Sequence, residues 1–457
     1  MRAFRPLLFL TALTSIASAR AGEARTFRVS PRQGAVEWAL HQASAGDTLL
    51  LASGVHQGRV RIAIPLTLRG EPGAVLEGSR EGSVLTIEAP GTVVEDLEIR
   101  ASGHRVITVD SGVRVLSASG VTLRRLRLRD VLYGVSAERS DGLLIDHCRL
   151  TGRVLPREER GDGNGLHLWY CKDTTLRENE LTRFLDGIYL SFVDRAKVEG
   201  NRLTDHGRYG LHTMYCQSTH LVGNEFAHNV AGIAIMFSNG LQVEKNRMVH
   251  NRGPRTYGLL LRDCSGGRFE ANDLIDNTVA IFMDNSNRNQ VVGNRLEDNG
   301  WGVILFSSCA GNDFTGNDFI DNDYPVALDM RHTDNRFDDG HRGNFWSGSA
   351  PYDLDGNGVS DVPYSPVSAF AFISKQYPDL SILARSPAVA ALSVAERVFP
   401  TLRPSEAVDR FPRVRPSGSS LGPHRSRPAS PRSWPAVTVF ALLLGTGVAG
   451  FARRGVS

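Results

Sequence analysis

The residues with the most distinctive chemistry in this sequence are one histidine and two methionines. His212 and Met214 lie two positions apart, and Met236 follows Met214 one repeat later. Residues two apart on a strand point to the same face. Imidazole and thioether groups on one face form a soft donor set that suits Cu(I). The pattern predicts a transient copper(I) site, with His167 as a further candidate; methionines that only fill the surface are the alternative.

Two other segments could bind metal ions. His228 and His250 hold equal positions in successive repeats, so they form a second, two-ligand copper candidate. A later loop has the spacing of a calcium-binding loop, with oxygen atoms at positions one, three, five and nine and glycine at position six; these are Asp353, Asp355, Asn357, Asp361 and Gly358. Because Tyr364 replaces the usual bidentate glutamate at position twelve, the loop is either a calcium site or a set of Asx turns.

A repeat of about 22 residues must position these side chains. Each repeat has an asparagine two positions before an apolar residue. A glycine also recurs once in nearly every repeat, at the same spacing of about 22 residues. The asparagines are Asn179, Asn201, Asn224, Asn246, Asn272, Asn294 and Asn317; the glycines are Gly165, Gly187, Gly210, Gly232, Gly258 and Gly302. Short alternating segments separated by Asn, Asp and Gly are typical of strands and turns, without crossover helices. The sequence therefore predicts an all-β fold, a single-stranded right-handed parallel β-helix, which is a solenoid.

The asparagines have a structural interpretation. Stacked asparagines can hydrogen-bond the next coil and tolerate the left-handed backbone of a sharp corner. A second column, formed by Asn229, Asn251, Asn277, Asn299 and Asn322, is interpreted in the same way. Leu128 and Leu150 extend the column of Leu181 backward, with an insertion of charged residues at 153–163.

The second and fourth positions after each glycine should point outward, yet they are mostly apolar or aromatic. The second positions are His167, Tyr189, His212, Ala234, Leu260, Phe282 and Ile304, and Phe306 is a fourth position. Such a stripe indicates a partner interface, or else cover by the chain's own tail. The interface candidates are Tyr189, Leu260, Phe282, Ile304 and Phe306.

The same face argues against catalysis by this chain. A β-helix lyase or epimerase of uronate polymers needs clustered acids with a base above a groove, and the outward columns lack paired acids. Such an enzyme remains the alternative function. Five cysteines do not predict disulfides either, because Cys171, Cys216 and Cys264 share a column two coils apart, about 9 to 10 Å, which exceeds disulfide reach.

The ends of the chain predict export and attachment to a membrane. Residues 1–21 have the basic, apolar and small-residue parts of a signal peptide, so a nucleic-acid partner is not expected. The β-helix spans 22–350, with a capping helix at 34–43; an Asp-rich loop and amphipathic helical segment follow at 351–411, and a disordered Pro/Arg-rich linker at 412–434. Residues 435–452 are uncharged and precede two arginines, which predicts a transmembrane helix or a processed sorting tail.

The helical segment has apolar residues at helical spacing, which include Leu380, Leu383 and Leu392, interrupted by Pro378, Pro387 and Pro400. It predicts one or two amphipathic helices. They are either a docking surface near the membrane or a cap over the open end of the stack.

Several stretches resemble the NosD family, the periplasmic β-helix proteins for maturation of nitrous oxide reductase. The resemblance covers about residues 25–410, and its most specific motifs are Gly210-Leu-His-Thr-Met-Tyr-Cys216, Asn251-Arg-Gly-Pro254, Tyr257-Gly-Leu-Leu-Leu261, Asn285-Ser-Asn-Arg-Asn289, Asn344-Phe-Trp346, Tyr352-Asp-Leu-Asp355 and Asp361-Val-Pro-Tyr364. The resemblance implies a periplasmic accessory role, in which the protein helps copper reach the copper-sulfur cluster of nitrous oxide reductase. The implied partners are a membrane ABC transporter (ATPase plus permease), nitrous oxide reductase and a copper chaperone. The linker and the apolar tail look like an addition, which is expected to tether the protein to the inner membrane.

Overall fold

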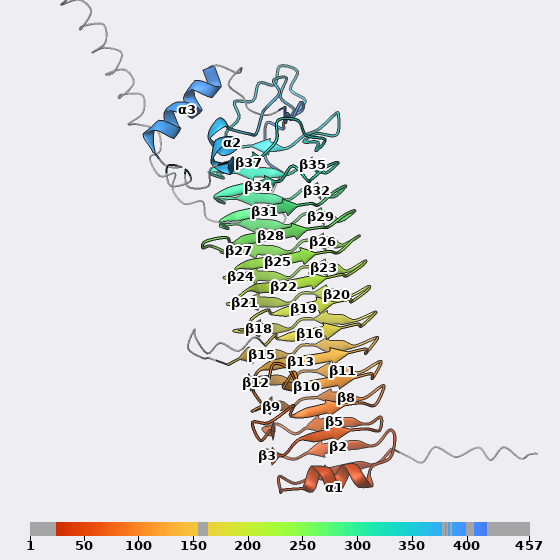
Figure 1. The fold of residues 1–457 in the computed structure, drawn as a ribbon. Coiled ribbons are helices and arrows are strands. Elements are labelled where there is room, and N and C mark those ends of the chain that lie inside the picture. The colour runs from red at the N-terminus through yellow and green to blue at the C-terminus, as the bar shows by residue number, and fades with distance from the viewer. Residues whose placement is uncertain are drawn as a thin grey trace, which may run out of the picture.

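The protein is a stack of coils whose strands form three parallel sheets (Figure 1). A computed structural model describes residues 24–153, 163–376, 380, 383, 386–398 and 406–417. Helix α1 (Ala35–Gln42) covers the N-terminal end, and α2 (Ala369–Gln376) and α3 (Pro387–Val398) lie near the other end. The predicted parallel β-helix, its capping helix and its C-terminal helices are thus confirmed.

Each regular coil adds one strand to every sheet. The first sheet contains β1 (Thr26–Val29), β2 (Thr48–Leu51), β5 (Thr67–Gly70), β8 (Val93–Glu95), β11 (Thr122–Arg124), β14 (Leu144–Asp146), β17 (Thr175–Arg177), β20 (Lys197–Glu199), β23 (His220–Val222), β26 (Gln242–Glu244), β29 (Arg268–Glu270), β32 (Gln290–Val292) and β35 (Asp313–Thr315). The second contains β4 (Val60–Ile62), β7 (Leu85–Ile87), β10 (Ser111–Leu116), β13 (Tyr133–Glu138), β16 (Leu166–Trp169), β19 (Ile188–Ser191), β22 (Tyr209–Met214), β25 (Ala231–Met236), β28 (Tyr257–Arg262), β31 (Val279–Asp284), β34 (Trp301–Leu305) and β37 (Tyr324–Leu328). The third contains β3 (Gly54–Gln57), β6 (Ala74–Glu77), β9 (Glu98–Arg100), β12 (Arg127–Val131), β15 (Arg149–Gly152), β18 (Glu180–Thr182), β21 (Arg202–Thr204), β24 (Glu225–Ala227), β27 (Arg247–Val249), β30 (Asp273–Ile275), β33 (Arg295–Glu297), β36 (Asp318–Ile320) and β38 (Phe345–Trp346).

The core lies inside the coils and follows the predicted register. Leu211, Ile233 and Leu259 are register partners on successive strands, and all three are buried. The glycine that precedes each of them is required by close packing of the coils. A Cβ atom at Gly210 would lie 2.6 Å from the carbonyl oxygen of Gly232, so a larger residue would push the coils apart.

The predicted asparagine columns form hydrogen-bonded ladders. The Oδ1 atom of Asn201 accepts from both the backbone N and the Nδ2 of Asn179, each at 2.9 Å. The same pair of contacts repeats coil by coil as far as Asn344. The second predicted column forms the same pair of hydrogen bonds near its C-terminal end, from Asn277 to Asn299 and from Asn299 to Asn322. A third ladder, which was not predicted from the sequence, links Asn289, Asn312 and Asn335.

The cysteines are packed thiols, as predicted. All five are free and buried. Burial raises the pKa of Cys216 to about 12 and that of Cys264 to about 11. These thiols are therefore unreactive at neutral pH.

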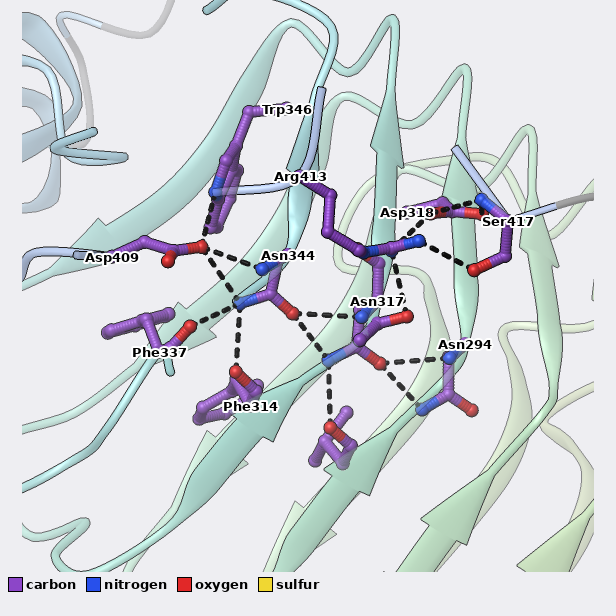
Figure 2. A network of polar contacts seen from close by, with 12 residues as sticks. Asn294, Phe314, Asn317, Asp318, Phe337, Asn344, Trp346, Asp409, Arg413 and Ser417 are labelled. Carbon is purple, nitrogen blue, oxygen red and sulfur yellow. Dashed lines mark hydrogen bonds and ion pairs between the residues drawn. The ribbon is translucent and has the colours of Figure 1, made fainter. Parts of the chain in front are cut away.

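Residues 406–417, which we call the C-terminal strap, return to close the end of the stack (Figure 2). The carboxylate of Asp409 accepts from the backbone N of Asn344 at 2.7 Å and from the indole Nε1 of Trp346 at 2.8 Å. Arg413 donates to the carbonyl oxygens of Gly316 and Asn317 at 2.9 and 3.0 Å. The strap thus ends the first ladder, because Asn344 has no further coil to bond.

The strap changes the predicted boundary of the linker. Arg413 is buried and forms an ion pair with Asp318, although the sequence assigned residue 412 to the start of a disordered segment. That boundary was wrong, and the packed chain continues to residue 417.

The signal peptide at 1–21, most of the insertion, the remainder of the linker and the apolar segment at 435–452 lie outside the described residues. Within the described part of the chain, none of the helices is long and apolar enough to cross a membrane.

Helix α2 covers part of the outward stripe. Ala371 packs with Ile304 and Ala327, beside Phe282 and Phe306. The backbone N of Ala369 donates to Glu396 of α3 at 2.8 Å, which joins the two helices. Cover by the chain's own C-terminal segment is therefore found at this end of the stripe.

Candidate metal site

The fold brings the predicted histidine and methionines onto neighbouring strands of the second sheet. His212 and Met214 are on β22, and Met236 on β25 is the register partner of Met214. Paired strands lie about 4.8 Å apart. Both methionines are half-buried, so two thioethers and one imidazole occupy one small region of the outward face.

His212 differs from the expectation of an exposed side chain, because only 4% of its surface is accessible. Its Nδ1 atom lies 3.2 Å from Oδ2 of Asp186, a fully buried residue. Its Nε2 atom is buried and has no hydrogen-bond partner among the residues that the structure describes. One ring nitrogen is therefore bound and the other is not.

Asp186 is the charged centre of this region. Arg208 donates to both carboxylate oxygens, with the Nε contact at 2.8 Å, and the backbone N of Tyr209 lies 3.2 Å from Oδ1. Burial raises the pKa of Asp186, but hydrogen bonds from Arg208 and His212 outweigh that effect and hold the pKa below its ordinary value. Asp186 is thus a carboxylate at neutral pH.

Tyrosine rings enclose the imidazole. The ring centroids of Tyr189 and Tyr209 lie 4.9 and 5.0 Å from that of His212. The hydroxyl of Tyr189 donates to the sulfur of Met214 at 3.4 Å. A metal ion that binds this thioether must displace that hydroxyl. Neither Asp186 nor Tyr209 was predicted as a site residue from the sequence. Each directly precedes a glycine of the predicted glycine column, Gly187 and Gly210.

The other copper candidates are less complete. His167 is separated from His212 by the coil of Tyr189, and burial lowers the pKa of His167 to about 4. The rings of His228 and His250 stack at 5.5 Å on an exposed corner, where Nδ1 of His250 lies 2.7 Å from Asp276. A set of three or more His, Cys, Asp or Glu side chains that could hold a metal is absent from the described residues.

The acidic loop fits the Asx-turn alternative. Asp353 accepts from the backbone N atoms of Gly356 and Gly358 at 2.8 and 2.9 Å, and Asp361 accepts from that of Leu354 at 2.7 Å. These carboxylates are used within the loop, and the calcium hypothesis for Asp353, Asp355, Asn357 and Asp361 gains no support.

The predicted partner interface is largely covered. Leu260 and Ile304 are buried, so they expose little surface to a partner, and their assignment to an interface stays a prediction. Tyr189, Phe282 and Phe306 are half-buried, as are Leu380 and Leu392, whereas Leu383 is exposed.

An exposed row of rings lies at the corner of the coils, one position after the ends of β16, β19, β22 and β25. The ring centroids of Tyr170, Phe192, Tyr215 and Phe237 are 4.7, 4.9 and 5.1 Å apart in order, and all four residues are exposed. The repeat contains the signal for this column, because each ring directly follows a fourth position such as Met214 or Met236. The predicted outward positions end at the fourth residue after each glycine, one residue before these rings.

Comparisons with known proteins identify the family. A probable ABC transporter binding protein NosD from Pseudomonas aeruginosa is 32% identical over 382 residues, which cover 80% of this chain and 87% of the relative. The chain belongs to the NosD family. The family model described as periplasmic copper-binding protein (NosD) matches residues 151–350, which include all six copper candidates. A second NosD, from Stutzerimonas stutzeri, is 28% identical and covers 83% of this chain and 89% of its own.

A solved structure agrees with the fold. The Dettilon tailspike protein has a TM-score of 0.50 and 13% identity, with 66% of each chain covered. At this identity the likeness shows the fold alone. The NosD relatives therefore carry the functional comparison.

Proposed function

We propose that this protein is a periplasmic accessory protein that holds copper(I) as cargo during the maturation of nitrous oxide reductase. The single observation that carries the proposal is the buried Nε2 atom of His212, which has no partner in the described structure and lies on the strand of Met214. The description of the NosD family as periplasmic and copper-binding supports it.

The donor set fits Cu(I). Thioether sulfur is a soft ligand that selects Cu(I), and neutral imidazole also binds copper. His212 would supply Nε2, while Met214 and Met236 would supply sulfur from adjacent coils. Because both thioethers are half-buried, they offer the route by which a copper chaperone delivers the ion and the reductase receives it. The protein's own residues bind and release the ion without chemical change, so the proposed role is not catalytic.

Met214→Leu combined with Met236→Leu tests the site. Leucine preserves volume and removes sulfur, so we expect the affinity for Cu(I) to fall at least about tenfold, or 1.4 kcal/mol, in competition with a chromophoric Cu(I) chelator. Met248→Leu is the matched control, because Met248 is fully buried on β27 in the third sheet and should not alter affinity. Unchanged Cu(I) binding in the double variant would refute the site and direct attention to His228 and His250.

The second part of the proposal is a complex with a membrane ABC transporter, an ATPase plus a permease. The names of both NosD relatives support it. We place the docking surface on α3, whose Ala388 and Ala391 are exposed, and we keep the tether by residues 435–452 as a prediction.

A chain that stops after Asp379 does not test docking cleanly, because it also lacks Asp409 and Arg413 of the strap. Ala388→Glu with Ala391→Glu is a better test. These changes should abolish co-purification with the transporter while the thermal unfolding temperature stays unchanged, whereas Ala388→Ser with Ala391→Ser should leave both unchanged. Retention of the transporter by the glutamate variant would exclude α3 as the docking surface.

A further inference from the structure

The buried carboxylate of Asp186 has more partners than a simple ion pair requires. Arg208 already donates to both of its oxygens, and a bidentate arginine satisfies the charge of a carboxylate well. His212 nevertheless directs Nδ1 at the same group, at 3.2 Å. The contact with His212 is therefore not needed to neutralise the charge of Asp186. Its effect is to fix the orientation of the imidazole ring.

The position of Asp186 is itself fixed by the fold. Its backbone N donates to Oδ1 of Asn164 at 3.2 Å, and the backbone N of Gly165 donates to its carbonyl oxygen at 2.9 Å. Both contacts come from the preceding coil. The carboxylate is thus held between that coil and the coil of Arg208 and His212.

This geometry determines which nitrogen of His212 carries the proton. An ionised carboxylate only accepts hydrogen bonds, so Nδ1 must be the donor and a neutral imidazole has its lone pair on Nε2. In metal sites, ligating histidines usually donate their other N–H to a carboxylate or carbonyl, which fixes the tautomer and the ring orientation. A buried polar atom without a partner also costs free energy, and a bound cation would remove that cost at Nε2.

A second buried histidine shows the opposite arrangement nearby. Nδ1 of His206 accepts from the backbone N of Phe184 at 3.3 Å, so a neutral His206 carries its proton on Nε2. A Cβ atom at Gly187 would lie 2.6 Å from that Nε2, which shows that the ring packs directly against the backbone. His206 therefore offers no lone pair and no space to an ion.

From these contacts we infer that Asp186 is a positioning residue, which fixes His212 in the tautomer whose Nε2 can bind a soft cation. Arg208 holds Asp186 in its ionised form and in place. The choice of Cu(I) as the cation rests on the proposed function, whereas the tautomer follows from the contacts of Asp186 alone.

The test measures the tautomer without metal, by long-range ¹H–¹⁵N correlation spectra of the histidine rings in the folded protein. In the wild type we expect the proton of His212 on Nδ1 and that of His206 on Nε2. A proton on Nε2 of His212 would overturn the inference without any variant being made.

Asp186→Asn provides the second measurement. Its amide can still accept from Arg208 but presents N–H to His212, so the proton of His212 should move to Nε2. The affinity for Cu(I) alone should then fall by about 10- to 100-fold, the usual effect of removing such a supporting group. His206→Gln, the matched control, should leave both the tautomer of His212 and the affinity unchanged.

The outcomes separate the two proposals. If the tautomer moves in Asp186→Asn but wild-type protein does not bind Cu(I), the proposed function fails and the positioning role of Asp186 remains. If wild-type protein binds Cu(I) and Asp186→Asn moves neither the tautomer nor the affinity, the positioning role fails and the proposed function remains.

Discussion

Buried polar side chains occupy two kinds of region in this protein, and the difference lies in their pairing. In the regular part of the asparagine ladders an amide accepts from the coil before it and donates both to the coil after it and to a main-chain carbonyl, as Asn246 does. At the candidate metal site, Asp186 is fully paired but His212 has one nitrogen without a partner. Paired polar groups contribute to stability, whereas an unpaired one costs free energy. Other buried atoms, such as Nε2 of His206, also have no partner among the described residues, so what distinguishes His212 is that it lies on the strand of Met214, beside the strand of Met236.

The ion pair that closes the stack should show the largest effect on stability. Arg413→Ala leaves the buried Asp318 without its cation, and breaking a buried pair costs about 3 to 5 kcal/mol. We expect that loss in the free energy of unfolding, measured by urea denaturation. Arg336→Ala breaks an exposed pair with Asp313 and should cost less than about 1 kcal/mol. Equal effects of the two changes would remove the distinction between paired burial and surface pairing.

A break within the ladder should be the next largest. Asn246→Ala removes the acceptor of Asn224 and the donor to Asn272, so the free energy of unfolding should fall by about 3 kcal/mol. The exposed Asn239, whose side-chain Oδ1 accepts from the backbone N of Ser265, is the control, and Asn239→Ala should cost less than about 1 kcal/mol. A loss below that limit for Asn246→Ala would mean that the ladder follows the fold and does not stabilise it.

The strap should make stability depend on pH. Burial raises the pKa of Asp409 to about 6, above its value in the unfolded chain, so the folded state binds the proton more tightly. The stability that the protonated Asp409 contributes is fully present below about pH 4 and is lost as the pH rises through about 6, a loss of about 3 kcal/mol for a difference of about two pKa units. Asp409→Asn should flatten this part of the curve of unfolding free energy against pH. The same slope in variant and wild type would assign it to other groups.

The smallest change in stability should occur at the candidate metal site. His212→Phe removes the unpaired nitrogen and keeps an aromatic ring between Tyr189 and Tyr209, while Arg208 continues to pair with Asp186. We expect the free energy of unfolding to stay within about 1 kcal/mol of wild type while Cu(I) affinity is lost. A large loss of stability would show that His212 has a structural role, like the asparagines.

The periodic parts of the molecule were predictable because their cause is local and repeated. Alternation at period two separates the inward Leu211 and Ile233 from the outward positions, and the fixed step places Asn179 above Asn201. The third ladder was missed because its asparagines recur only near the end of the stack. The exposed rings at Tyr215 and Phe237 were missed because they lie at corners, just after the strands that the alternation describes.

By itself, the sequence determined the coil, its register, the two long asparagine ladders and the shared face of His212, Met214 and Met236. Only the tertiary structure decided which outward side chains are buried and what they contact. Burial depends on neighbouring side chains, such as Asp186, Arg208 and Tyr189 around His212. The alternation of apolar and polar residues along one strand does not predict which side chains these neighbours are. The closure of the stack depends on a segment that returns over a long sequence separation, from Asp409 to Asn344, and no local pattern encodes such a contact.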